Sequence, residues 1–95
     1  MPETTAISET VELPREPEHY RHTNHSRNRF RQHDRMINAN VIRTAIQEGD
    51  LEAGDRPGTS HFVLSFGALQ FTLVVDNEPE SDGIHNIVTM FPNRR

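Results

Sequence analysis

Three residues of the segment HYRHTNHSRNRFRQHD (19–34) have the types and spacing for phosphate chemistry. His25, Arg29 and His33 lie four residues apart, so they would line one face of a helix. Histidine titrates near neutrality and can act as acid or base, while arginine offers a charged planar fork for phosphate. The stripe therefore predicts cleavage of RNA by attack of a 2′-hydroxyl, with these three as catalytic residues. Simple phosphate binding fits the same pattern equally well.

The arginines around this stripe make one basic segment in an acidic chain. The chain has ten arginines, no lysine and fourteen acidic residues, and its net charge is −4. Six arginines fall within residues 21–43, where Asp34 is the sole acid. This asymmetry predicts a local anion site, in which Arg27, Arg31 and Arg35 would bind phosphate. A solvated charged helix face explains the same charges about as well.

A second histidine pattern raises the question of a metal. His19, His22 and His25 are spaced by three, which would bring neighbouring imidazoles together if the segment were helical. No carboxylate is placed as an obvious further ligand, and the surrounding arginines oppose cation binding. The chain also has no cysteine, which excludes disulfides and thiolate ligands. We therefore expect no metal site and no cofactor.

Length and composition set the frame for these residues. Ninety-five residues suit one modest domain, and the 33% apolar content falls mostly after Phe30. Residues 1–17 are acidic and contain three prolines, which predicts a disordered tail before a domain at 18–95. We find no apolar run of the roughly 20 residues that cross a bilayer and no secretory signal, so we expect a cytoplasmic protein. Arginine in place of lysine suggests a salt-adapted source such as a halophilic archaeon, although high genomic GC content would have the same effect.

Two helices should position the stripe. Thr23 or Asn24 can cap a helix that runs to about Asp34, and Phe30 is its one large apolar residue. A second helix, VIRTAIQE (41–48), has an apolar stripe at helical spacing, with Gly49 in the left-handed position after it. We expect a mobile loop over 49–60 and a short edge strand over 18–23.

Alternation with period two follows these helices. HFVLSF (61–66) and ALQFTLVV (68–75) form a hairpin around Gly67, and IHNIVTMF (84–91) adds a last strand. The fold class is therefore α+β, with two N-terminal helices packed on a small antiparallel sheet. The other sheet face would be polar, and either solvated or open to a ligand. It would show His61, Ser65, Gln70, Thr72, His85 and Thr89.

The stretch HSRNRFRQHDRMINANVIRTAIQEG (25–49) resembles the small RelE-like domains of unknown function related to the BrnT toxins. The pattern shared is a His-x3-Arg helix, an isoleucine, a capped helix ending in glycine, and strands that end like "VVTVY". The matching positions cover about residues 19–92 and continue into TLVV and IVTMFP. His25 and Arg29 match the family's helix pair, whereas His33 stands where a second arginine is common and Phe91 replaces a frequent tyrosine.

The resemblance implies a RelE-like fold and a toxin-antitoxin role. A protein of this kind would be a metal-independent, toxin-like endoribonuclease or RNA-binding protein, and its partner would be an antitoxin-like protein. Phe91 lacks the hydroxyl with which a tyrosine could transfer a proton. The alternative is a non-enzymatic RelE-like module that binds a protein partner or nucleic acid through the same basic face.

Overall fold

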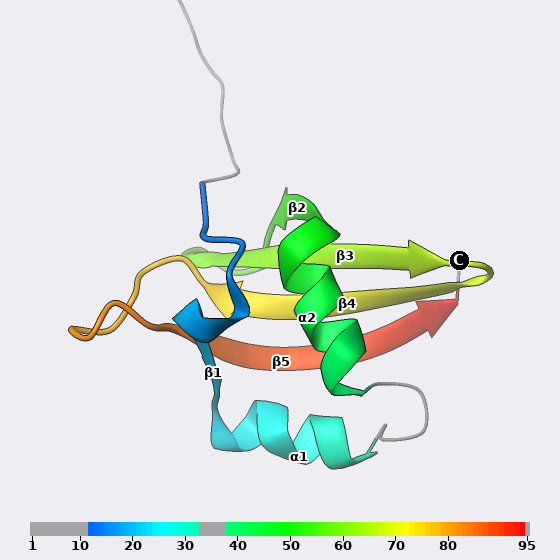
Figure 1. Cartoon of the computed structure of the whole chain (residues 1–95), viewed down its shortest axis with the longest axis horizontal. Helices are drawn as coiled ribbons and strands as arrows, with labels where there is room; N and C mark the ends of the chain where they lie inside the picture. The colour runs from blue at the N-terminus through cyan, green and yellow to red at the C-terminus, as the bar shows by residue number, and fades with distance from the viewer. Residues whose placement is uncertain (1–11, 33–37, 95) are drawn as a thin grey trace, which may run out of the picture.

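The computed structural model describes residues 12–32 and 38–94, which form a mixed sheet with two α-helices (Figure 1). Residues 12–16 lead into a short 3₁₀ turn, η2, and the sheet order is β1-β5-β4-β3-β2. The elements in chain order are η2 (Pro17–His19), β1 (Tyr20–His22), α1 (Asn24–Gln32), α2 (Ala39–Glu48), β2 (Asp50–Ala53), β3 (Thr59–Phe66), β4 (Leu69–Asp76) and β5 (His85–Arg94).

The α+β class is confirmed, but the expectation of a purely antiparallel sheet is wrong. β1 pairs with β5 in parallel, while β2, β3, β4 and β5 pair in antiparallel succession. The short edge strand predicted near residues 18–23 is confirmed as β1. β2 lies in a stretch predicted to be a loop. Its sequence DLEA alternates polar and apolar residues, but over only four positions and with Leu51 as the one large apolar side chain, so the pattern is too short to stand out.

Helix α2 covers one face of the sheet, and the core lies between them (Figure 1). Asn38 begins the helix, because its Oδ1 accepts a hydrogen bond of 3.0 Å from the Val41 backbone N–H. The apolar stripe of the helix is buried at Ile42, Ala45 and Ile46. The fully buried side chains of the sheet face it from alternate positions of the three long strands: Phe62, Phe71, Leu73, Val75 and Met90.

Gly49 ends α2 for a reason other than the predicted one. Its φ is −66° and its ψ is 158°, so it is extended and not left-handed. A Cβ built at this residue would lie 2.5 Å from Ala45 O and 3.2 Å from Val63 O. Glycine is therefore required chiefly because a Cβ would collide with the Ala45 carbonyl of its own helix, and next with β3, and not because of a left-handed backbone.

A β-bulge in β5 changes which face its residues occupy. Val74 pairs with Thr89, but Val75 pairs with Ile87, so Val88 is an extra residue. The bulge turns His85 toward the helix-covered side, which corrects the expectation that it lies on the open face. His85 is buried, its Nδ1 lies 2.9 Å from Asp76 O, and its ring centroid is 5.4 Å from that of Tyr20. Thr72 is also buried, with 4% of its surface exposed.

The folded unit begins before residue 18. Leu13 is part of the buried core, and the Tyr20 hydroxyl donates a hydrogen bond of 2.7 Å to Pro14 O. Arg15 donates to Ile46 O (3.3 Å) and Gly49 O (2.7 Å) at the end of α2. These contacts attach Leu13, Pro14 and Arg15 to the folded unit, on the N-terminal side of residue 18. No helix in the described residues is long and apolar enough to cross a membrane.

Candidate functional site

A groove of about 730 Å³ lies on the sheet face opposite α2. Its strand residues alternate with the buried core: His61 precedes Phe62, Val74 stands between Leu73 and Val75, and Thr89 precedes Met90. We call it the open-face groove. It is lined by Thr23, His25, Asp55, Arg56, Pro57, Thr59, His61, Val74, Asp76, Val88, Thr89 and Phe91.

The sheet register builds the floor of the open-face groove. Val74 pairs with His61 on one side and with Thr89 on the other, so these three residues stand side by side on β3, β4 and β5. Phe91 follows Thr89 on the same face of β5. The floor therefore combines a histidine, a hydroxyl and apolar surface on three rigid, hydrogen-bonded strands.

Helix α1 forms a wall of the groove because Thr23 fastens it to β5. The Thr23 hydroxyl donates to Ile87 O (2.9 Å), and the Thr23 backbone N–H donates to the same oxygen (3.2 Å). The same hydroxyl oxygen accepts a bond of 3.2 Å from the Ser26 backbone N–H, which caps the first turn of α1. Both the start of α1 and its distance from the sheet are thus fixed by one side chain.

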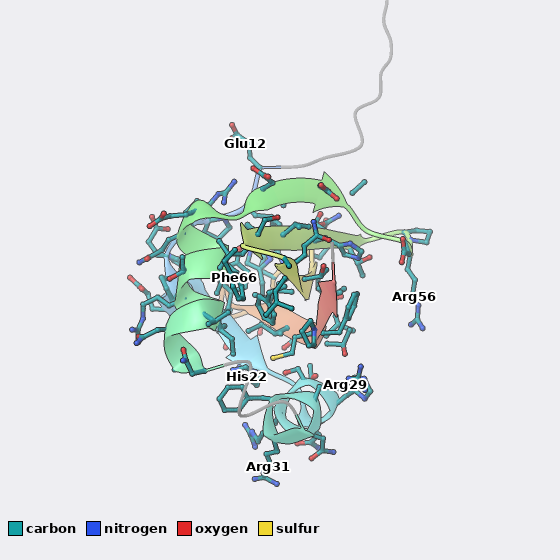
Figure 2. All side chains as sticks on the ribbon, turned by 90° about the vertical axis from the view of Figure 1, so that its right-hand side faces the viewer. Glu12, His22, Arg29, Arg31, Arg56 and Phe66 are labelled. Atoms are coloured by element: carbon teal, nitrogen blue, oxygen red, sulfur yellow. The ribbon has the colours of Figure 1, made fainter. Side chains whose placement is uncertain are left out.

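The packed residues of α1 decide which of its side chains reaches the groove. Ser26 is fully buried and Phe30, one turn later, packs on the core. At 100° per residue, His25 and Arg29 then lie together on one flank of this buried stripe. His25 is exposed and lines the open-face groove. Arg29 is half-buried and lies on the side of α1 nearer the sheet, while Arg31 points away from it (Figure 2).

Of the residues predicted from the sequence, the structure brings His25 to the groove. Arg29 is its neighbour on the helix, whereas Arg27 and Arg31 are exposed on α1 and do not line the groove. His33 and Arg35 lie outside the described residues. Of the predicted triplet, the structure therefore describes His25 and Arg29 but not His33.

Two further residues with suitable chemistry reach the groove from elsewhere. His61 belongs to β3 and lines the groove. In the sequence, the alternation of β3 placed it on the face expected to be polar, and nothing further marked it as a candidate site residue. Arg56 comes from the loop between β2 and β3, for which the sequence offered no signal. In Figure 2 it extends from that loop on the side of the sheet away from α2.

The loop that carries Arg56 is held by local hydrogen bonds. The Thr59 hydroxyl donates to Arg56 O (2.7 Å), and the Thr59 backbone N–H donates to the same oxygen (3.2 Å). The Asn77 backbone N–H donates to Gly58 O (2.8 Å), which ties the loop to the end of β4. These bonds hold the backbone from which Arg56 reaches the groove.

The charges around the open-face groove are mixed. Asp55 and Asp76 contribute two carboxylates to the lining and Arg56 contributes one guanidinium. Helix α1 adds three arginines and no acid, since its sequence is NHSRNRFRQ. The charged lining residues therefore amount to two carboxylates against one guanidinium, and the arginines of α1 add positive charge beside the groove, with Arg29 on the sheet side of the helix.

His22 and His19 are engaged away from the groove. Ser26 Oγ donates to Thr23 O (3.3 Å), which leaves it to accept from His22 Nδ1 (3.0 Å). Burial, with a smaller contribution from the nearby Arg27 guanidinium, lowers the pKa of His22 below its ordinary 6.5. His19 Nε2 lies 3.7 Å from a Glu16 carboxylate oxygen.

The three histidines spaced by three residues thus have different surroundings. His19 faces Glu16, His22 bonds to Ser26, and His25 lines the groove. Within residues 12–32 and 38–94, no three His, Asp or Glu side chains are grouped closely enough to hold a metal ion. Any function of His25 is therefore to be sought with the groove residues and not with His19 and His22.

Comparisons with known proteins leave the groove as the main guide to function. No protein-family model, no curated protein and no solved structure matches the chain. The resemblance to RelE-like domains accordingly stays a prediction from residues 19–92.

Proposed function

We propose that the protein is a metal-independent endoribonuclease whose active site is the open-face groove. The observation that carries the proposal is the presence of His25 and His61, from α1 and β3, in one groove that also contains Arg56. Two imidazoles and a guanidinium in one groove supply the kinds of group that phosphodiester cleavage needs: a base, an acid and a positive charge. In this proposal His61 takes the second proton-transfer role that the sequence pattern gave to His33.

The reaction would proceed by attack of the substrate's own 2′-hydroxyl. One of the two histidines, in its neutral form, removes the 2′-hydroxyl proton as O2′ bonds to phosphorus. The other, in its protonated form, donates a proton to O5′ as the P–O5′ bond breaks. The products are a 2′,3′-cyclic phosphate and a 5′-hydroxyl. Arg56 would stabilise the negative charge that develops on the phosphate oxygens, with Arg29, on the same flank of α1 as His25, as the second candidate.

The shape and charge of the groove favour a single-stranded substrate. Val74, Val88 and Phe91 give it apolar surface, and an aromatic ring can stack on a nucleobase. The carboxylates of Asp55 and Asp76 limit the positive charge, which suits a few phosphates better than a long duplex. As in the RelE-like toxins that the sequence resembles, an antitoxin-like partner would then control the activity.

A non-enzymatic RNA-binding module is the second candidate. Phe91 favours it, because a phenyl ring on the groove floor provides a stacking surface but no proton. In this alternative the same residues would hold a phosphate and a base without breaking the chain.

Cleavage of single-stranded RNA by the purified protein in excess EDTA separates the two candidates. The enzyme proposal expects products with 2′,3′-cyclic phosphate ends, strongly reduced in His25→Ala. The matched control is His19→Ala, which removes a partly exposed histidine outside the groove. Binding without cleavage would favour the module, and equal cleavage by all three proteins would point to a contaminating nuclease.

A further inference from the structure

Strand β3 extends beyond its edge neighbour β2. The register pairs β2 with Ser60–Val63, so Leu64, Ser65 and Phe66 have no partner in β2 on that side. Their other side is paired with β4. Among the residues that the structure describes, no strand covers this edge at the end of β3, which makes it a template for another strand.

An apolar groove lies beside this free edge. It has a volume of about 350 Å³ and lies between the start of α2 and the end of β3, with Val41, Thr44, Leu64 and Phe66 in its lining. Phe66 is 40% exposed, and within residues 12–32 and 38–94 it is the one large apolar residue that is exposed to this degree. Figure 2 shows Phe66 on the α2 side of the sheet. An exposed phenyl ring and an apolar groove thus lie next to each other.

The end of β3 itself carries no protective charge, and Arg94 at this end of the sheet belongs to β5, on the far side of β4. Residues 64–69 are LSFGAL, and the side chains that line the apolar groove are uncharged. The edge of β2, in contrast, carries Asp50 and Glu52. Natural proteins block exposed edges with charged side chains to prevent pairing, so the uncharged end of β3 is the part of this edge that is left able to pair.

We propose that Leu64–Phe66 pairs antiparallel with the same residues of a second copy of the chain. A two-fold axis at Ser65 would place Leu64 opposite Phe66 of the second copy and Phe66 opposite its Leu64. Each Phe66 would then enter the apolar groove of the other copy beside Val41 and Thr44. The proposal is independent of the nuclease proposal, because the apolar groove and the open-face groove lie on opposite sheet faces.

The occupant is a second copy because the surface is complementary to itself. An isologous contact requires that the inserted side chain and the groove that receives it lie on the same surface patch, as Phe66 and the groove beside Leu64 do. It also requires that the patch not repel the same patch of a second copy. In a chain of net charge −4, an uncharged patch meets this condition. The patch at 64–69 meets it.

Sedimentation equilibrium of the full chain, up to about 1 mM, tests the proposal. We expect a reversible monomer–dimer equilibrium whose Kd rises at least about tenfold in Phe66→Glu. A second variant, Thr44→Arg, fills the apolar groove without changing Phe66 and should have the same effect. Gln47→Glu is the matched control for Phe66→Glu, since it adds the same negative charge at an exposed position near the other end of α2.

Hydrogen exchange gives a second measurement on the same samples. The outward-facing amides of 64–66 should exchange more slowly as the protein concentration rises, and not in Phe66→Glu. Circular dichroism shows whether each variant is folded. A chain that is monomeric at every concentration overturns the proposal, and so does a dimer that persists unchanged in folded Phe66→Glu and Thr44→Arg.

Discussion

His25 of α1 and His61 of β3 line the same groove although they come from different parts of the fold. Two sets of hydrogen bonds bring them there. The β3–β4–β5 ladder places His61 in line with Val74 and Thr89, and Thr23 fastens the start of α1 to Ile87 of β5. The groove therefore depends on how α1 is attached to β5.

Replacing Thr23 tests this attachment. Thr23→Ala removes the hydroxyl that caps α1 and that donates to Ile87 O, so it should lower the free energy of unfolding by about 0.5–2 kcal/mol. Thr23→Ser keeps the hydroxyl and should lose much less. Urea unfolding of both variants measures the difference, and equal stability of the two would contradict the role given to the hydroxyl.

The environment of His22 predicts a pH dependence of stability. Its pKa is lower in the folded protein than its ordinary 6.5, chiefly because of burial, so the unfolded chain binds the proton more readily. The stability that the neutral imidazole contributes is present above pH 6.5 and is lost as the pH falls through the lowered folded-state pKa. His22→Gln should flatten this part of the stability curve in unfolding experiments from pH 7.5 down to about pH 5. An unchanged curve would be inconsistent with His22 as its source.

Gly49 predicts a steric effect. Gly49→Ala would bring a Cβ against Ala45 O, a backbone atom that cannot turn aside, and should destabilise the fold by about 1–3 kcal/mol. Gln47→Ala, on an exposed turn of the same helix, is the control and should be close to neutral. Thermal unfolding compares them. A stabilised Gly49→Ala would mean that the Ala45 carbonyl does not lie as close to residue 49 as the structure shows.

Arg56 predicts a measurable electrostatic contribution to RNA binding. Arg56→Gln should weaken binding of a single-stranded oligonucleotide and reduce the slope of log K against log salt by about 0.7, as expected for one lost phosphate contact. Arg43→Gln removes an equal charge from an exposed position of α2, on the other face of the sheet, and should change the slope little. Fluorescence titrations at several salt concentrations measure both slopes. Equal losses in the two variants would indicate non-specific attraction.

The long, regular elements could be predicted from the sequence because their patterns are local. α2 and the three long strands follow from apolar spacing alone, and Phe30 and Thr23 were recognisable as an anchor and a cap. The parallel pairing of β1 with β5 joins the two ends of the chain, and no local pattern encodes it. β2 was missed because its alternation extends over only four residues.

The groove was predictable only on the α1 side. His25 and Arg29 could be singled out because helical spacing relates them directly. Arg56 lies in a loop rich in glycine, and its place depends on backbone hydrogen bonds to Thr59 that the sequence does not reveal. His85 was assigned to the wrong face because one extra residue, Val88, reverses the alternation of β5.

The central claim is that His25 and His61 act together on one phosphodiester. It is tested most directly by the single-turnover rate of RNA cleavage in His25→Ala, His61→Ala and the double variant, measured in EDTA with folding checked by circular dichroism. Each single substitution should reduce the rate at least about 10²-fold, and the double should be little slower than either, because residues that act as a unit are not additive. A folded His61→Ala protein that cleaves as fast as the unsubstituted chain would contradict the claim.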